Sequence, residues 1–195
     1  MKRFLMTAAI LGLCAAQPLF AADKRFKVFG AAAWVGPLSE DDFEIDTIDD
    51  TLEASDAVGW NFGVEFQFTD RLGLEVDYLN STQDIEFGGE TIAEVDFQPL
   101  SASLNIHLFD SDAFDLYVAP VASWVNWGDI EGDGDSVGTD SEFAWGAQIG
   151  LDIGLGDTVA IVLGLRYLNL DLSSDLGGDL GVDPLIARAG IGLRF

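Results

Sequence analysis

The sequence contains very few groups that could carry redox, metal or nucleic-acid chemistry. It has one cysteine, Cys14, and one histidine, His107, among 195 residues. A single cysteine excludes an internal disulfide framework and a cysteine-based zinc site. Nine residues are Lys or Arg against 34 Asp and Glu, which gives a formal net charge of −25. This balance excludes nucleic acid as a partner, because binding its phosphate backbone requires many basic side chains.

Residues 1–22 are predicted to form a cleaved secretory signal peptide. Lys2 and Arg3 supply the charged start, and the apolar stretch 4–16 is too short to span a bilayer. Small residues up to Ala22 suit cleavage, which would remove Cys14 and leave residues 23–195 as a single domain. We therefore expect an exported protein that has no thiol.

After the signal peptide the sequence lacks any run of about 20 apolar residues, so no transmembrane helix is expected. Yet 49% of the residues are hydrophobic, so the many acids must be segregated from a large apolar surface. Two fold classes satisfy these conditions. One is a soluble β-protein with an internal core, and the other is an outer-membrane β-barrel whose apolar face meets lipid.

Several segments alternate apolar and polar residues with period two, which predicts β-strands with two different faces. In NFGVEFQF, residues 61–68, every even position is Phe or Val and the odd positions are Asn, Gly, Glu and Gln. Four further segments alternate in the same way. Together with two less regular segments and the last strand, the predicted strands are 25–36, 61–68, 72–79, 100–108, 115–128, 145–153, 159–167 and 184–195.

The connections between these segments alternate in length. Short turns are predicted at 69–71, 110–114 and 155–157, and longer acidic connections at about 37–57, 80–94, 129–141 and 172–183. An even number of strands with alternating short and long connections is typical of outer-membrane barrels. The sequence therefore predicts an all-β fold, an eight-stranded antiparallel up-and-down transmembrane β-barrel.

The aromatic residues are sorted along the predicted strands. The tryptophans lie where strands meet the long connections: Trp34, Trp60, Trp124, Trp127 and Trp145. A set of phenylalanines lies near the short turns: Phe26, Phe68, Phe109, Phe114 and Phe195. Rings at both rims of an apolar band are typical of interfacial girdles. Periodicity alone does not say which face is inside, but the girdles and the glycines on the polar face favour the membrane barrel over a soluble lipocalin-like one.

The sequence ends on ARAGIGLRF, a strand whose apolar face finishes at Phe195. This strand is expected to pair with the first one, because an open edge in lipid would leave backbone groups without partners. Bacterial outer-membrane proteins typically end on such an aromatic residue, which the barrel-insertion machinery reads. By this resemblance Phe195 is the predicted insertion signal.

Several stretches of sequence, in a fixed order, carry a more specific resemblance. They are KVFGAAAWVGP, WNFGVEFQFTDRLGLEVDYL, PLSASLNIHLFD with FDLYVAPVASW, FAWGAQIGLDIGL with GLRYLNLDL, and VDPLIARAGIGLRF. In this order they resemble the OmpW family of small outer-membrane proteins over nearly all of the predicted mature chain. The resemblance implies an eight-stranded barrel in the outer membrane of a Gram-negative bacterium, with passive passage of small, often hydrophobic molecules. This chain differs from the family in its greater acidity and in Pro120, which lies inside a predicted strand.

The polar faces of the predicted strands carry six charged residues near mid-depth: Glu65, Glu75, Asp77, Asp152, Arg166 and Arg188. They predict either a network of ion pairs that plugs the lumen or a polar path for ions. The plug is favoured, because an eight-stranded barrel is barely wide enough for its own side chains and buried charges must be paired.

A plugged lower lumen would leave a hydrophobic solute only a sideways exit into the membrane. Trp60, Phe143 and the first long connection are candidates for the mouth of that path, and Pro99 and Pro120 could weaken strand pairing beside it. The alternatives are that the tryptophan belongs to the girdle and that each proline marks a strand end or a bulge.

The connection DIEGDGDSVGTD approximates a twelve-residue calcium loop, with Gly134 at the sixth place. Its oxygen donors are Asp129, Glu131, Asp133, Asp135 and Asp140. The alternative is a solvated acidic loop. Divalent cations could also bridge the acidic connections to the anionic outer leaflet and its lipopolysaccharide, and no other cofactor is expected.

Catalysis is not expected, because the only histidine, His107, falls with Ser101 and Ser103 on the predicted lumen face as an ordinary satisfied residue. A structural or surface-binding barrel is the alternative function. Such an adhesin-like or receptor-like protein would have a sealed lumen and would act through its acidic extracellular loops.

Overall fold

The computed structural model describes residues 25–37, 52–87, 90–111, 113–128, 130–131, 136–137, 141–173, 179–181 and 183–195. The predicted signal peptide, residues 1–22, lies outside this part of the chain. Within the described residues there is no helix long and apolar enough to cross a membrane.

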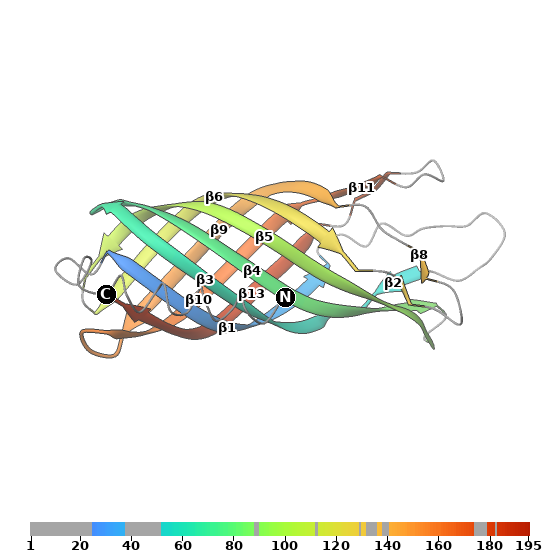
Figure 1. Cartoon of the computed structure of the whole chain (residues 1–195), viewed down its shortest axis with the longest axis horizontal. Coiled ribbons are helices and arrows are strands. Elements are labelled where there is room, and N and C mark those ends of the chain that lie inside the picture. The colour runs from blue at the N-terminus through green and yellow to red at the C-terminus, as the bar shows by residue number, and fades with distance from the viewer. Residues whose placement is uncertain are drawn as a thin grey trace, which may run out of the picture.

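Eight long strands form the wall of a closed barrel (Figure 1). They are β1 (Phe26–Pro37), β3 (Ala57–Thr69), β4 (Leu72–Phe87), β5 (Glu90–Asp110), β6 (Phe114–Trp127), β9 (Glu142–Gly154), β10 (Val159–Asn169) and β13 (Pro184–Arg194). Each pairs antiparallel with its neighbour, and β1 pairs with β13 from Lys27↔Arg194 to Pro37↔Pro184. The predicted eight-stranded antiparallel barrel is confirmed.

Short strands extend the wall at the end that carries the long connections, here called the loop end, at the right of Figure 1. β2 (Leu52–Ala54) pairs with β4, β7 (Ile130–Glu131) with β5, and β8 (Ser136–Val137) with β7. β11 (Asp171–Ser173) and β12 (Asp179–Gly181) form a separate hairpin. The opposite end, with tight turns such as the one at Asp70 and Arg71, is called the turn end.

The predicted long connection at 80–94 is wrong. β4 continues to Phe87 and β5 begins at Glu90, and the two strands pair from Ser81↔Phe97 to Phe87↔Glu90. The segment is rich in polar residues because beyond the bilayer both faces of a hairpin can meet water. Periodicity in hydrophobicity is therefore lost there while the backbone ladder persists.

The two faces of the wall are reversed relative to a soluble protein. On β3, the side chain of Phe62 is 59% exposed, whereas Glu65 on the other face is only 3% exposed. The same reversal runs round the barrel, with large apolar side chains outside and charged ones inside. A continuous apolar outer surface is unfavourable in water and favourable in lipid. This apolar outer surface excludes the soluble barrel, whose outer face would be polar.

The tryptophan girdle is confirmed at four positions and wrong at the fifth. Trp34, Trp60, Trp124 and Trp145 point outward with exposed fractions of 36–63%. Trp127 points into the lumen, where its ring centroid lies 5.1 Å from that of Phe97. The reason is strand parity, since residues three apart on one strand lie on opposite faces.

The last residue is fixed in the barrel seam. The Phe195 N–H donates to the carbonyl of Phe26 at 2.8 Å, and the Phe26 N–H donates to the carbonyl of Phe195 at 3.2 Å. The first and last strands thus leave no open edge between them, as a wall in lipid requires.

Candidate functional site

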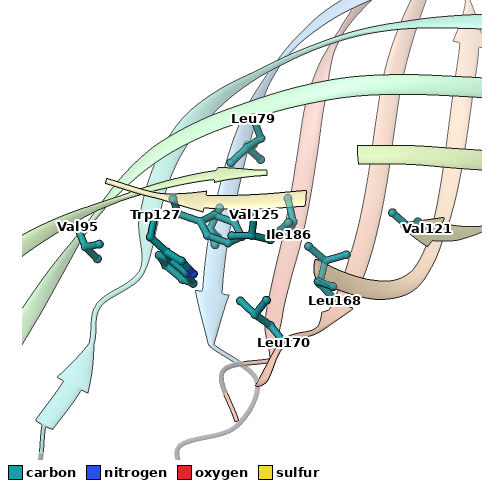
Figure 2. Packing of buried hydrophobic residues seen from close by; sticks show 12 residues of the cluster. Leu79, Val95, Val121, Val125, Trp127, Leu168, Leu170 and Ile186 are labelled. Atoms are coloured by element: carbon teal, nitrogen blue, oxygen red, sulfur yellow. The ribbon is translucent and has the colours of Figure 1, made fainter. Parts of the chain in front are cut away.

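The lumen is divided along the barrel axis into two layers of different chemistry. Towards the loop end most inward side chains are hydrophobic, with Ser81 and Gln83 of β4 as buried polar exceptions, and Figure 2 shows how the hydrophobic ones converge. This apolar layer consists of Ala33, Val35, Leu79, Val95, Phe97, Val121, Val125, Trp127, Ala144, Leu168, Leu170 and Ile186. Strands near this end carry apolar residues on both faces, since one face meets lipid and the other meets the apolar layer.

Towards the turn end the inward side chains are charged. This charged layer consists of Lys27, Glu65, Glu75, Asp77, His107, Asp115, Asp152, Arg166, Arg188 and Arg194. Nearly all of them are buried, and Arg194 is the most exposed, with 14% of its side chain accessible. Charges in such a confined space require partners, and ion pairs link the members of the layer to one another.

The centre of the charged layer is built on two arginines from β10 and β13. Arg166 donates to Asp77 through both Nη atoms, at 2.5 and 3.0 Å. Arg188 Nη2 donates to Glu75 Oε1 at 2.8 Å and to the Tyr117 hydroxyl at 3.1 Å. Forked arginine–carboxylate contacts are among the strongest hydrogen bonds in proteins, so this centre ties four strands across the lumen.

A second group of ion pairs lies nearer the turn end. Lys27 Nζ lies 2.6 Å from Glu65 Oε2 and 2.8 Å from Asp152 Oδ2. Arg194 Nη2 also approaches Asp152 Oδ2, at 3.3 Å. The first strand is thereby joined to β3 and β9 through the interior as well as through its neighbours in the wall.

His107 completes the charged layer on β5. Its Nδ1 lies 2.7 Å from Asp115 Oδ1 and its Nε2 lies 3.0 Å from Glu65 Oε1. Ser101, which shares its face, instead contacts Ser123 at 2.7 Å and accepts a hydrogen bond from Arg166 at 2.9 Å. The ring is therefore positioned to bind carboxylates rather than to activate a serine hydroxyl.

The structure brings the six charged residues proposed from sequence into one layer, and it adds Lys27, Asp115 and Arg194 to them. Sequence reasoning missed these three because they lie at strand ends or in irregular strands. Their parity is the signal that could have identified them, since each shares a face with known lumen residues of its own strand.

The proposed mouth residues do not line the lumen. Trp60 and Phe143 lie on the outer face, with exposed fractions of 45% and 64%. Trp60 instead packs against Phe62 and Tyr78, at centroid distances of 5.3 and 5.5 Å, within the outer aromatic belt. Their side chains can border an opening only on its lipid side.

The side chains of the proposed calcium loop, Asp129, Glu131, Asp133, Asp135 and Asp140, lie outside the described part of the structure. Within the described residues, no group of three His, Cys, Asp or Glu side chains is arranged to hold a metal ion. The calcium loop stays a prediction.

The backbone ladder between β4 and β5 is interrupted at the level of the apolar layer. Pairing stops after Tyr78↔Leu100 and resumes at Ser81↔Phe97. Pro99 lies in this interval and has no N–H to donate to β4. An apolar groove of about 340 Å³ lies beside the interval, and Tyr78 and Leu100 form part of its lining.

A similar interruption lies on the other side of β5. Pairing between β5 and β6 stops after Ser103↔Val121 and resumes at Ile106↔Val118. Pro120 lies in this interval and likewise lacks an N–H. The two prolines therefore leave the fourth of the eight wall strands less firmly attached than the rest.

The family assignment rests on a match over nearly the whole chain. The model of the outer membrane protein beta-barrel domain matches residues 6–195. The chain belongs to this family. Membership places the protein in the outer membrane of a Gram-negative bacterium, with its apolar belt in lipid.

Solved barrels share the fold at low sequence identity. OprG from Pseudomonas aeruginosa is 17% identical, with a TM-score of 0.73 over 87% of this chain and 95% of that one. Neisserial surface protein A is 14% identical, with a TM-score of 0.63 over 87% and 97%. AlkL is 17% identical, with a TM-score of 0.54 over 87% and 89%. No curated protein matches the sequence.

Proposed function

We propose that this barrel gives small hydrophobic molecules a passive path into the outer membrane, as the resemblance to the OmpW family implies. A solute would enter the apolar layer from the loop end and leave sideways between strands. The observation that supports this proposal is the division of the lumen, because an apolar layer ends on a charged layer that a hydrophobic solute cannot cross without separating buried ion pairs.

The interval at Pro99 is the proposed lateral exit. Pro99 is buried on the lumen face of β5, next to the apolar-layer residues Phe97 and, on β4, Leu79. Opening the wall here separates strands that already lack one backbone hydrogen bond. The groove outside this interval is lined mostly by apolar side chains, with Asp77 as the charged exception, and would receive the solute on the lipid side.

The interval at Pro120 also has an apolar groove beside it, of about 530 Å³, but it faces a different part of the lumen. It includes Asn105, whose amide donates to Glu65 at 2.8 Å and to Glu75 at 3.3 Å, so it opens onto the charged layer. The two prolines thus provide a matched comparison, because each removes one backbone N–H donor, one beside the apolar layer and the other beside the charged layer.

Restoring the missing donor with Pro99→Ala is expected to slow uptake of a small hydrophobic fluorescent reporter, because an added hydrogen bond of about 1 kcal/mol closes the exit. That energy corresponds to a roughly fivefold lower open fraction. The measurement is the initial uptake rate in cells that carry no barrel, the unmodified barrel or the variant, at equal amounts of inserted protein.

Pro120→Ala is the control and is expected to leave the rate unchanged, and a polar solute of similar size should be taken up equally by all strains. Equal reporter uptake with and without the inserted barrel would rule out the proposed transport. Equal effects of the two proline variants would rule out the Pro99 exit.

We also propose that Phe195 serves the insertion machinery as well as the seam. Phe195→Ser keeps the backbone bonds to Phe26 available but removes the aromatic ring. The fraction of protein inserted in the outer membrane is expected to fall several-fold, measured by heat-dependent gel mobility of membrane fractions. Normal insertion in cells would contradict the recognition role.

A surface-binding role is the second candidate, and the loop-end sheet favours it. β2, β4, β5, β7 and β8 continue beyond the lumen as one sheet, and the register places Asp84 opposite Glu94 and Glu94 opposite Glu131. Such an acidic platform would suit a cationic surface, or lipopolysaccharide bridged by divalent cations. Deleting residues 84–94 would abolish binding of this kind. The same deletion would alter only the entrance of a transport path and would leave the lumen intact.

A further inference from the structure

His107, the single histidine, has a hydrogen-bond acceptor at each of its two ring nitrogens, whereas a neutral ring can donate to only one acceptor. Both oxygens that face its ring belong to carboxylates, Asp115 Oδ1 at Nδ1 and Glu65 Oε1 at Nε2. An ionised carboxylate only accepts hydrogen bonds, and a neutral imidazole donates from one nitrogen alone. Both contacts are satisfied together only when His107 is an imidazolium.

The charge balance of the described lumen leads to the same state independently. The charged layer contains five carboxylates: Glu65, Glu75, Asp77, Asp115 and Asp152. It contains four side chains that are cationic at neutral pH: Lys27, Arg166, Arg188 and Arg194. With a neutral histidine the layer carries one uncompensated negative charge, and with an imidazolium it is neutral, as burial favours.

The other groups around the ring do not supply the missing charge. From β3, the amide nitrogen of Gln67, a donor without charge, lies 3.1 Å from Nε2 and 3.3 Å from Nδ1. From β6, the Tyr117 ring packs at a centroid distance of 5.5 Å, and from β4 the facing residue is Gly73. Lys27 of β1 binds Glu65 on its other oxygen. Asp110 of β5 is the cross-strand partner of Asp115 and interacts with His107, but its side chain is exposed at the turn end and lies outside the buried layer.

We propose that the proton on His107 closes the charged layer of the lumen to cations. While it is present, the imidazolium ties β3, β5 and β6 together across the turn end. When hydroxide removes it at alkaline pH, Glu65 and Asp115 face a neutral ring and the layer becomes net negative. Water and cations would then enter from the turn end, so the barrel would gain a cation-selective leak separate from any path for hydrophobic solutes.

The first test is the protonation state itself. Because the chain has one histidine, ¹⁵N-labelled histidine in the folded, lipid-embedded barrel gives one pair of ring signals. Both nitrogens are expected to show the imidazolium shifts at pH 7.5, where an imidazole free in water is about nine-tenths neutral. One protonated and one bare nitrogen at this pH would overturn the proposal.

The second test is conductance in planar bilayers. His107→Gln is expected to conduct cations about tenfold more than the unmodified barrel at pH 7, because a net negative lumen concentrates cations. The unmodified barrel should approach that conductance as the pH is raised, and His107→Lys, which keeps the charge, should stay closed over the same range.

Arg25→Gln is the matched control, since it removes one positive charge at the turn end outside the charged layer. It is expected to leave the conductance low. Equal conductance of His107→Gln and the unmodified barrel at every pH would overturn the proposal, and if His107→Gln does not fold, the ring signals decide alone. Neither readout uses a hydrophobic solute, so the result is independent of the proposed lateral path.

Discussion

Replacing Arg188 with methionine is expected to lower the free energy of unfolding by about 3–5 kcal/mol. Its guanidinium binds Glu75 and Tyr117, and its Cζ lies 4.6 Å from the centroid of the Phe29 ring. Methionine fills much of the same volume but leaves a buried carboxylate short of a charged partner. Loss of one member of a buried ion pair is far more destabilising than removal of both.

The measurement is reversible denaturant unfolding in lipid vesicles, followed by tryptophan fluorescence. Arg194→Met is the control: its side chain lies at the rim of the layer, where it contacts Asp152, and its loss should lower the stability by less than about 1 kcal/mol. The double variant Arg188→Met with Glu75→Met should recover part of the loss. Equal stability of Arg188→Met and the unmodified barrel would mean that the charged layer does not plug the lumen.

Placing an arginine on the outer face at mid-depth should destabilise the barrel by about 2–4 kcal/mol, because the charge must enter lipid. Val76 on β4 is such a position, with its side chain 39% exposed on the apolar belt. The same substitution at Val58, near the loop end of β3 and 75% exposed, should lose at most about 1 kcal/mol.

Val76→Arg and Val58→Arg remove the same side chain and add the same charge, so the difference between their stability losses reflects the depth of each position in the membrane. Unfolding in vesicles of defined thickness gives that difference directly. Indistinguishable stabilities would contradict a belt in lipid, because an arginine facing water is tolerated at either position.

The wall of the barrel was predictable from local sequence, and the layering of the lumen was not. The residue types at Phe62 and Glu65 reveal which face of β3 each occupies, because one face meets lipid and the other meets charged side chains. Val121 and Val125 do not, since near the loop end of β6 both sides are apolar and the alternation disappears. Period-two analysis detects a contrast between faces, so an apolar lumen inside an apolar belt escapes it.

The partners within the charged layer depend on the register of distant strands. Glu75 and Arg188 meet because the closed sheet brings β4 and β13 opposite each other across the lumen. Their sequence positions predict a shared environment but not a contact. His107 illustrates the same limit: its parity predicted the lumen, whereas its two carboxylate neighbours come from strands on either side of β5.

The seam between β1 and β13 has a consequence for how the protein is made. Lys27 pairs with Arg194, so the barrel closes between residues near opposite ends of the chain. Closure must therefore await β13, the last of the wall strands along the chain, and such long-range pairing is slow. Until then the apolar outer face and the two open strand edges are exposed, and such surfaces make an unclosed barrel prone to aggregate.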